Sequence, residues 1–401
     1  MLRIYFSSIV LVVLSGFITH CGAQDSRPLM EQYLHSGQLR QGEMALESQL
    51  QKNPKDDQAR FGLGLIRIVR AVETMGQSFY QVGLKPTSNW VPFVRLPIPH
   101  NPEPNPVSYL SFRRILDQFT TDMAQAEATL AAITDDEVKL PLRLAHIKID
   151  LDGDGQATDQ FLEMLNKLMG APPELLKANP EFLVHFDRGD VAWLRAYCHL
   201  LGAMLEIYLS VDTEADFYFF AKEHFPRVKP FLTADEENRL RGKQMMQTFS
   251  IQFKEPKRLS RFRHHLLDVA KLNRETWRYI RAETDDQYEW LPNAKQKGVF
   301  NLPVRDEMIT TWLTMMGELE SMLEGKSLIP MDFFGNTRGK GLNVKTLLED
   351  PPQSIDFNSV MQQGPAAKYL ETGTNMNFEG ISAVMRAFDN PMRMGYFAWF
   401  N

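Results

Sequence analysis

Apolar residues recur every three or four positions through much of the chain, which places them on one face of an α-helix. The strongest such segment covers 191–209. It is apolar on most sides, has Asp190 as its expected N-cap, and predicts a buried central helix. Further stripes predict helices over 109–130, 254–281 and 304–323. We therefore predict a mainly α fold, in which helical hairpins pack around this central apolar helix.

Two stretches break the helical pattern. Six prolines fall between Trp90 and Pro106, and because proline fixes φ and lacks a backbone N–H, we expect an extended connector over 90–107. Glycine and proline become frequent again after residue 325, which predicts an irregular C-terminal region over 326–401. Its end, 394–400, is too apolar for a free tail and should pack against the body of the protein.

The N-terminal residues carry the features of an export signal. Arg3 provides a positive charge ahead of an apolar run over 9–18, and Cys21-Gly22-Ala23 offers small residues for cleavage. We expect 1–23 to be a signal peptide and the mature protein to be extracytoplasmic, either periplasmic or secreted. Two alternatives stay open. One is a lipoprotein anchored at Cys21, which bulky His20 disfavours, and the other is an uncleaved anchor.

These boundaries define the predicted organisation of the chain. It consists of a signal peptide at 1–23, helical hairpins at 24–89, a proline-rich connector at 90–107, a helical core domain at 108–325 and the irregular C-terminal region at 326–401, packed on the core. No second apolar run is long enough to cross a bilayer, so contact with a membrane is expected only through a lipid anchor at Cys21.

Residues 30–70 have the pattern of paired helices. Gly37-Gln38-Leu39 begins one helix, Asn53-Pro54 ends it, and a second apolar helix follows with Gly64 at a small-residue position. The pattern resembles a tetratricopeptide repeat, although Gly42 falls where that family prefers alanine. The resemblance implies a scaffold that binds a protein or a peptide. An ordinary helical hairpin explains the same pattern and stays open as the alternative.

The most specific chemistry lies in Asp150-Leu151-Asp152-Gly153-Asp154-Gly155. Three aspartates at alternate positions, followed by glycine, resemble the first half of an EF-hand calcium loop over 150–161. By this resemblance Asp150, Asp152 and Asp154 donate carboxylate oxygens, and Gln156 donates its backbone carbonyl. Calcium is the expected cofactor, because a hard cation offsets the repulsion between crowded carboxylates.

The second half of this loop departs from the EF-hand pattern. Position 12, where a bidentate glutamate closes the calcium site, is Phe161, so we expect weak binding. The apolar run 140–149 precedes the loop, and apolar residues at helical spacing follow it over 161–169, as in the order helix, loop, helix. An acidic surface turn that binds no metal remains the alternative.

Composition excludes other classes of protein. Apolar residues make up 44% of the 401 residues, enough for a substantial core, and the chain carries 44 Lys+Arg against 50 Asp+Glu. A net charge of -6 does not favour binding to nucleic acid. The chain has 2 cysteines, of which Cys21 belongs to the signal, so a disulfide framework is not expected.

No catalytic or cofactor-binding residue is assigned from a motif. A phosphate-binding loop, His-Glu-x-x-His, Gly-x-Ser-x-Gly and Cys-x-x-Cys are all missing from the sequence. His185, Asp187, Arg188 and Asp190 crowd one turn ahead of the central helix, and Glu206 lies near the end of that helix. Acids in a helical cleft could serve a carboxylate-dependent hydrolase, whereas capping and turn formation explain the same residues structurally.

The arrangement as a whole resembles uncharacterised exported bacterial proteins that combine helical hairpins with one Asp-x-Asp-x-Asp-Gly loop, a resemblance that carries no known activity. Our first hypothesis is a non-catalytic, extracytoplasmic helical binding or scaffold protein, with a weak structural calcium site. The alternative is a hydrolase of polysaccharide or cell-envelope material that uses Asp187, Asp190 or Glu206. Substrate, partner and oligomeric state are not specified by the sequence.

Overall fold

The protein is described from a computed structural model. The described residues are 27–85, 96–160, 179–247, 249–331, 339–377, 379 and 400. Within them the fold is mainly α-helical, which confirms the predicted fold class. The proposed signal peptide with Cys21, the first residues of the connector, Phe161 and most of the apolar end lie outside the described residues.

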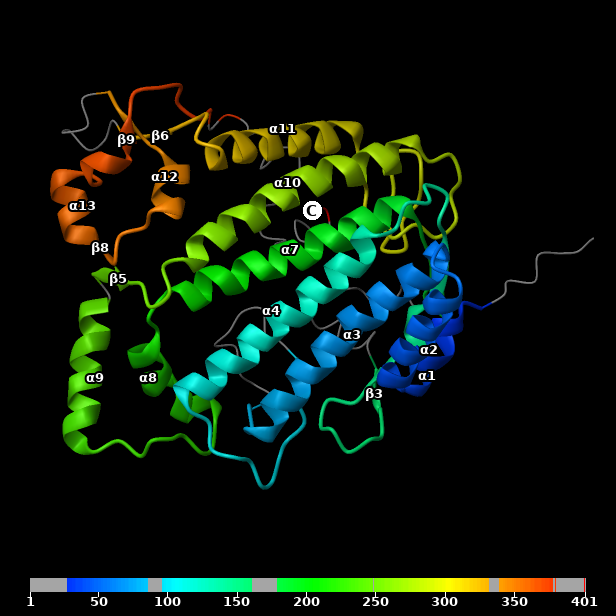
Figure 1. The fold of residues 1–401 in the computed structure, drawn as a ribbon, viewed down its shortest axis with the longest axis horizontal. Coiled ribbons are helices and arrows are strands. Elements are labelled where there is room, and N and C mark those ends of the chain that lie inside the picture. The colour runs from blue at the N-terminus through cyan, green and yellow to red at the C-terminus, as the bar shows by residue number, and fades with distance from the viewer. Residues whose placement is uncertain are drawn as a thin grey trace, which may run out of the picture.

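Long helices that follow one another in the chain form a layer (Figure 1). They pack side by side in the order α2 (Leu39–Lys52), α3 (Asp57–Gln81), α4 (Tyr109–Ala131), α7 (Arg188–Ser210), α10 (Arg258–Ala282) and α11 (Asp306–Leu323). Each helix runs antiparallel to the one before it. Phe79 near the end of α3 meets Phe112 near the start of α4, and Gly189 at the start of α7 lies against Ile280 at the end of α10.

The predicted central helix is α7, and it packs against both α4 and α10. Its N-cap is Asp187 and not Asp190 as the sequence suggested. Asp187 accepts hydrogen bonds from the N–H groups of Gly189 and Asp190, while Asp190 accepts one from the N–H of Asp187. This reciprocal arrangement is a capping box. The prediction was wrong because two acids three residues apart both fit the capping preference.

The N-terminal helices α1 (Leu29–Ser36), α2 and α3 pack closely because glycines lie at their contacts. A Cβ atom on Gly42 would lie 2.7 Å from the Cβ of Tyr33, and one on Gly62 would lie 2.8 Å from the Sδ atom of Met30. Helix α3 continues for 25 residues, past the point where the second helix of a repeat would be expected to start. The tetratricopeptide resemblance therefore stays a prediction.

Short strands connect the helices. The strands β1 (Leu140–Arg143) and β4 (Leu183–Phe186) form one antiparallel pair, and β2 (Lys148–Ile149) and β3 (Asp159–Gln160) form another. A single 3-10 turn, η1 (Leu144–His146), separates β1 from β2. The sequence favoured a helix before the acidic loop. The chain is extended there instead, with Pro141 inside β1 and side chains alternating between buried and half-buried.

The remaining elements lie at one end of the layer (Figure 1). They are α8 (Glu214–His224), α9 (Ala234–Gln247), β5 (Ser250–Gln252), β6 (Ile329–Pro330), β7 (Gly341–Leu342), α12 (Val344–Glu349), β8 (Ser354–Asp356), α13 (Phe357–Gln363), η2 (Ala367–Tyr369) and β9 (Leu370–Glu371). Strand β5 pairs with β8, and β6, β7 and β9 form a three-stranded sheet. The C-terminal region thus contains short regular elements in its described part.

Near the end of the chain, Phe400 is fully buried, and its ring packs against those of Trp277 and Trp312 at centroid distances of 4.4 and 5.7 Å. These contacts join the end of the chain to α10 and α11. None of the described helices is long and apolar enough to cross a membrane.

Candidate functional site

The acidic loop connects β2 to β3, and its aspartates organise its backbone. The two carboxylate oxygens of Asp150 accept hydrogen bonds from the N–H groups of Gly153 and Gly155, at 2.6 and 3.0 Å. Asp152 accepts one from the N–H of Asp154, and Asp154 accepts one from the N–H of Gln156. Gly153 and Gly155 have φ angles of 77° and 85°, which other residues rarely adopt, so these glycines permit the tight turn.

The three predicted metal ligands converge. One carboxylate oxygen from each of Asp150, Asp152 and Asp154 lies within 4.8 Å of the other two. Asp150 is buried, Asp152 is half-buried and Asp154 is exposed, so the group opens to solvent on one side. Burial raises the pKa of Asp152, and a side-chain hydrogen bond with Asp150 and the charges of Asp154 and Asp150 add to this shift. A divalent cation would relieve this repulsion.

The loop is also fixed to the N-terminal helices. The carboxylate of Glu73 on α3 accepts a hydrogen bond from the N–H of Asp150, and the Gln77 side chain donates one to the carbonyl of Asp150, both at 2.9 Å. Leu151 is fully buried against Gly76. At the turn between α1 and α2, a Cβ atom on Gly37 would lie only 2.0 Å from that of Ala157. Ordering the loop therefore orders its contact with α1, α2 and α3.

Glu73 adds a fourth acid beside the loop. Burial raises its pKa to about 7; the hydrogen bond from Asp150 opposes this shift, and the charge of Asp150 adds to it. The carboxylate oxygens of the three aspartates suit a hard cation such as calcium. Gln156, whose carbonyl was the fourth predicted ligand, is exposed at the end of the turn. Phe161 and the helix predicted after it lie outside the described residues, so the closing half of the loop stays a prediction.

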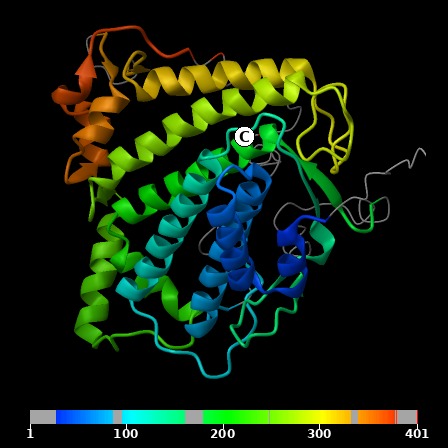
Figure 2. The same ribbon diagram turned by 45° about the vertical axis from the view of Figure 1, so that its right-hand side comes forward.

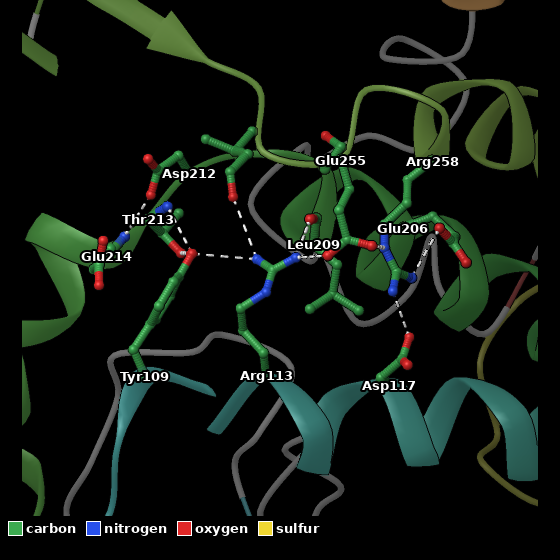
Figure 3. Close-up of polar contacts among 12 residues, drawn as sticks. Tyr109, Arg113, Asp117, Glu206, Leu209, Asp212, Thr213, Glu214, Glu255 and Arg258 are labelled. Carbon is green, nitrogen blue, oxygen red and sulfur yellow. Dashed lines mark hydrogen bonds and ion pairs between the residues drawn. The ribbon is translucent and has the colours of Figure 1, made fainter. Parts of the chain in front are cut away.

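A second polar centre joins α4, α7 and the start of α10 (Figure 3). Arg113 is only 6% exposed, and its guanidinium donates to the carbonyls of Leu209 and Val211, to the hydroxyl of Tyr109 and to the carboxylate of Glu255. Burial alone would raise the pKa of Glu255, but the hydrogen bonds from Arg258 and Arg113 hold that pKa below its usual value.

Arg258 extends this network to further residues of α4 and α7. Its guanidinium contacts Glu255, Glu206 and Asp117 at 2.8, 3.2 and 2.6 Å, and Arg261 also pairs with Glu206 at 3.0 Å. A pocket of about 420 Å³ opens beside the network. Its lining consists of Leu110, Arg113, Arg114, Asp117, Leu209, Glu255 and Arg258. Three arginines and two acidic residues therefore line one open hollow.

The acids considered for a hydrolase make capping and ion-pair contacts within the fold. Asp187 and Asp190 form the capping box of α7, and Glu206 is 3% exposed and paired with two arginines. Along α7, Glu206 lies about 28 Å from Asp187, because a helix rises 1.5 Å per residue. Paired glycosidase carboxylates lie about 5 to 9.5 Å apart, so Glu206 cannot act as a partner to either capping acid.

The other members of the predicted turn are dispersed. The Nδ1 atom of His185 contacts the carbonyl of Gln287, and Arg188 forms ion pairs with Asp136 and Glu275. The turn therefore does not assemble an acid, a histidine and an arginine around one substrate position.

Comparison with protein-family models, with curated proteins and with solved structures finds no match for this chain. The functional interpretation therefore depends on the geometry of the sites. Two groups were not found from the sequence, namely Glu73 beside the acidic loop and Arg113 in the polar centre. Each is a single charged residue on an amphipathic helix, and only the contacts made after folding distinguish it from other surface charges.

Proposed function

We propose that this protein is a non-catalytic, extracytoplasmic helical scaffold that binds a protein or peptide partner, and that calcium bound by Asp150, Asp152 and Asp154 braces its acidic loop. The observation that carries the calcium proposal is the convergence of these three carboxylates within 4.8 Å on a loop packed against α1, α2 and α3. The Gln156 carbonyl would complete this side of the ion. The role of calcium is to hold the loop and the N-terminal helices together.

Calcium binding should be measurable as an increase in thermal stability. If the dissociation constant is about 1 mM, as in weak extracellular calcium modules, 10 mM calcium adds about 1.4 kcal/mol to the free energy of unfolding. With an unfolding entropy of about 2.1 cal/mol/K per residue, this increment raises the melting temperature of a chain of this length by about 2 °C. Magnesium at the same concentration should have a smaller effect, because it demands stricter octahedral geometry.

The test compares the protein with an Asp152→Ala/Asp154→Ala variant in calorimetry and thermal melting. A Glu103→Ala/Glu137→Ala variant is the matched control, because it removes two exposed acids outside the loop. The loop variant should lose a calcium-dependent stabilisation that the control retains. An equal calcium response in all three proteins would contradict the assignment to this loop.

The pocket beside Arg113 supports a binding role for the helical layer. Arg114 and Leu110 on its rim are exposed, and Leu110 is 61% exposed, so an approaching chain meets both a positive charge and an apolar side chain. This chemistry fits an acidic peptide segment with a neighbouring apolar residue. We propose that the partner places such a segment in the pocket.

A labelled hexaglutamate peptide provides the probe, with hexalysine as its control. The protein should bind hexaglutamate more tightly than hexalysine, and Arg114→Glu should weaken that binding at low salt, as measured by fluorescence anisotropy. Equal binding of the two peptides, or unchanged binding by the variant, would exclude this pocket as an acidic-peptide site.

Export and membrane attachment are further parts of the proposal, and they are supported by the sequence pattern of 1–23. The protein should be recovered outside the cytoplasm with a new N-terminus after Ala23. A mature N-terminus at a lipid-modified Cys21 would replace soluble export by lipid anchoring.

A further inference from the structure

A second group of carboxylates lies where the start of α7 meets the end of α10. Asp187 is the N-cap of α7, Glu283 directly follows the last residue of α10, and Glu289 lies between α10 and α11. One carboxylate oxygen from each of the three lies within 4.8 Å of the other two. Antiparallel packing of α7 and α10 brings these sequence-distant acids to the end of the layer where the yellow loops lie (Figure 2).

Asp190 joins this group as its most deeply buried member, at 3% exposure. Its charge interacts with those of Asp187, Glu283 and Glu289, so its carboxylate lies near theirs, outside the group of three whose oxygens converge within 4.8 Å. One of its oxygens accepts the hydrogen bond from the N–H of Asp187. The other oxygen, Oδ1, is buried and has no hydrogen-bond partner in the described part of the chain. We call these four residues the α7 acid cluster.

Among the described residues, little positive charge lies near the α7 acid cluster. Lys139 attracts Asp187 and Glu289, but its ammonium group is engaged with Asp285 at 2.6 Å. The neighbouring Arg188 is directed to Asp136 and Glu275, and its guanidinium lies over the ring of Tyr279. In the described part of the chain, three converging carboxylates and the neighbouring Asp190 are thus not matched by cations. This is unfavourable unless bound protons or a bound cation offset the charge.

We propose that the α7 acid cluster is a binding site for a calcium ion, separate from the Asp150 loop. Oxygen atoms are its only donors, which favours a hard cation over zinc or copper. Calcium binds oxygens at about 2.3 to 2.6 Å, so two ligands on opposite sides of the ion lie up to about 5 Å apart. The oxygens of Asp187, Glu283 and Glu289 lie within this span of one another. Asp190, whose buried Oδ1 has no hydrogen-bond partner among the described residues, lies beside these three acids and adds to the negative charge that the ion would offset.

The site would fasten the chain between α10 and α11 to the start of α7. Glu289 is followed by Trp290, whose ring packs against Phe186, Trp193 and Phe300 at centroid distances of 5.7, 5.5 and 5.0 Å. A cation held by Glu289 therefore fixes an aromatic group that joins β4, α7 and this connecting chain. Because Trp290 lies next to a proposed ligand, it also provides a spectroscopic probe of the site.

The test uses Glu283→Gln/Glu289→Gln, which keeps side-chain size and removes two charges. Asp152→Ala/Asp154→Ala serves as the comparison at the other site, and Glu103→Gln/Glu137→Gln as the matched control for lost charge. Calcium stoichiometry is measured by calorimetry on the mature protein. Terbium, which replaces calcium and emits when excited through a nearby tryptophan, is titrated in parallel. Circular dichroism verifies that each variant is folded.

Two calcium ions should bind to the protein and to the control variant, and one to each site variant. Glu283→Gln/Glu289→Gln should also weaken tryptophan-excited terbium binding at least tenfold, whereas the Asp150-loop variant should retain it. A folded Glu283→Gln/Glu289→Gln protein with unchanged calcium stoichiometry and terbium emission would overturn this proposal. If the Asp150 loop bound no calcium, the protein would bind one ion instead of two. The loop variant would then bind that same ion, and only Glu283→Gln/Glu289→Gln would lose it.

Discussion

Replacing Arg113 by methionine tests whether the polar centre holds the helical layer together. Methionine retains much of the side-chain volume but removes the donors to Leu209, Val211 and Glu255. The arginine is 6% exposed, so its carbonyl partners would stay buried without their charged donor. Glu255 is 43% exposed at its side chain and keeps Arg258, which limits its own loss.

These contacts set the expected magnitude. Breaking a buried ion pair by removing one partner costs about 3 to 5 kcal/mol, and the exposure of Glu255 places this variant near the lower end, at about 3 kcal/mol. If the free energy of unfolding falls by roughly 3 kcal/mol per molar urea, the urea concentration at the unfolding midpoint should decrease by about 1 M. The assay is urea unfolding followed by circular dichroism.

Arg114→Met is the matched control, because Arg114 is the adjacent residue in α4 and is exposed. Its free energy of unfolding should change by no more than about 0.5 kcal/mol. If Arg113→Met lost less than about 1 kcal/mol, or no more than Arg114→Met, the network would not stabilise the packing of α4 against α7.

Two further predictions concern close packing and pH. Gly42→Ala should destabilise the protein by about 1 to 3 kcal/mol, because the added Cβ would overlap neighbouring side chains. Gly317→Ala, with open space around the added Cβ, should stabilise α11 by roughly 0.5 to 1 kcal/mol. Urea unfolding measures both changes, and equal effects of the two variants would contradict the packing argument. Without added divalent cations, the free energy of unfolding should fall as pH rises from about 5 to about 8. Burial and the charge of Asp187 raise the pKa of Glu283 to about 8, and burial raises the pKa of Glu289 to about 7. Both groups bind protons more tightly in the folded state, so their contribution is present at low pH and is lost as pH passes the raised values. Glu283→Gln should flatten this dependence in denaturation measured across pH, and an unchanged slope would refute it.

Helical periodicity predicted the long helices well, because each hides one apolar face and the spacing of that face is visible in the sequence. The predicted ends of these helices were less accurate. Asp190 was chosen as the N-cap of α7, whereas Asp187 occupies that position and Asp190 completes the capping box. The short strands β1 and β2 were missed because an apolar run of this length, interrupted by Pro141, fits several local structures.

The two acidic sites differ in how much the sequence reveals. Asp150, Asp152 and Asp154 are close in sequence, so alternate spacing alone predicted that they would converge. Asp187 was noticed for its local turn, but Glu283 and Glu289 come from another part of the chain. Their meeting depends on the antiparallel packing of α7 and α10, which no local pattern encodes.

Amide hydrogen exchange with and without 10 mM calcium tests most directly whether calcium braces this fold. The account predicts slower exchange in calcium at the loop amides that the aspartates bind, those of Gly153, Asp154, Gly155 and Gln156, and in adjoining segments of α3. The Asp152→Ala/Asp154→Ala variant should lose this protection. Identical exchange at these amides with and without calcium would contradict the account.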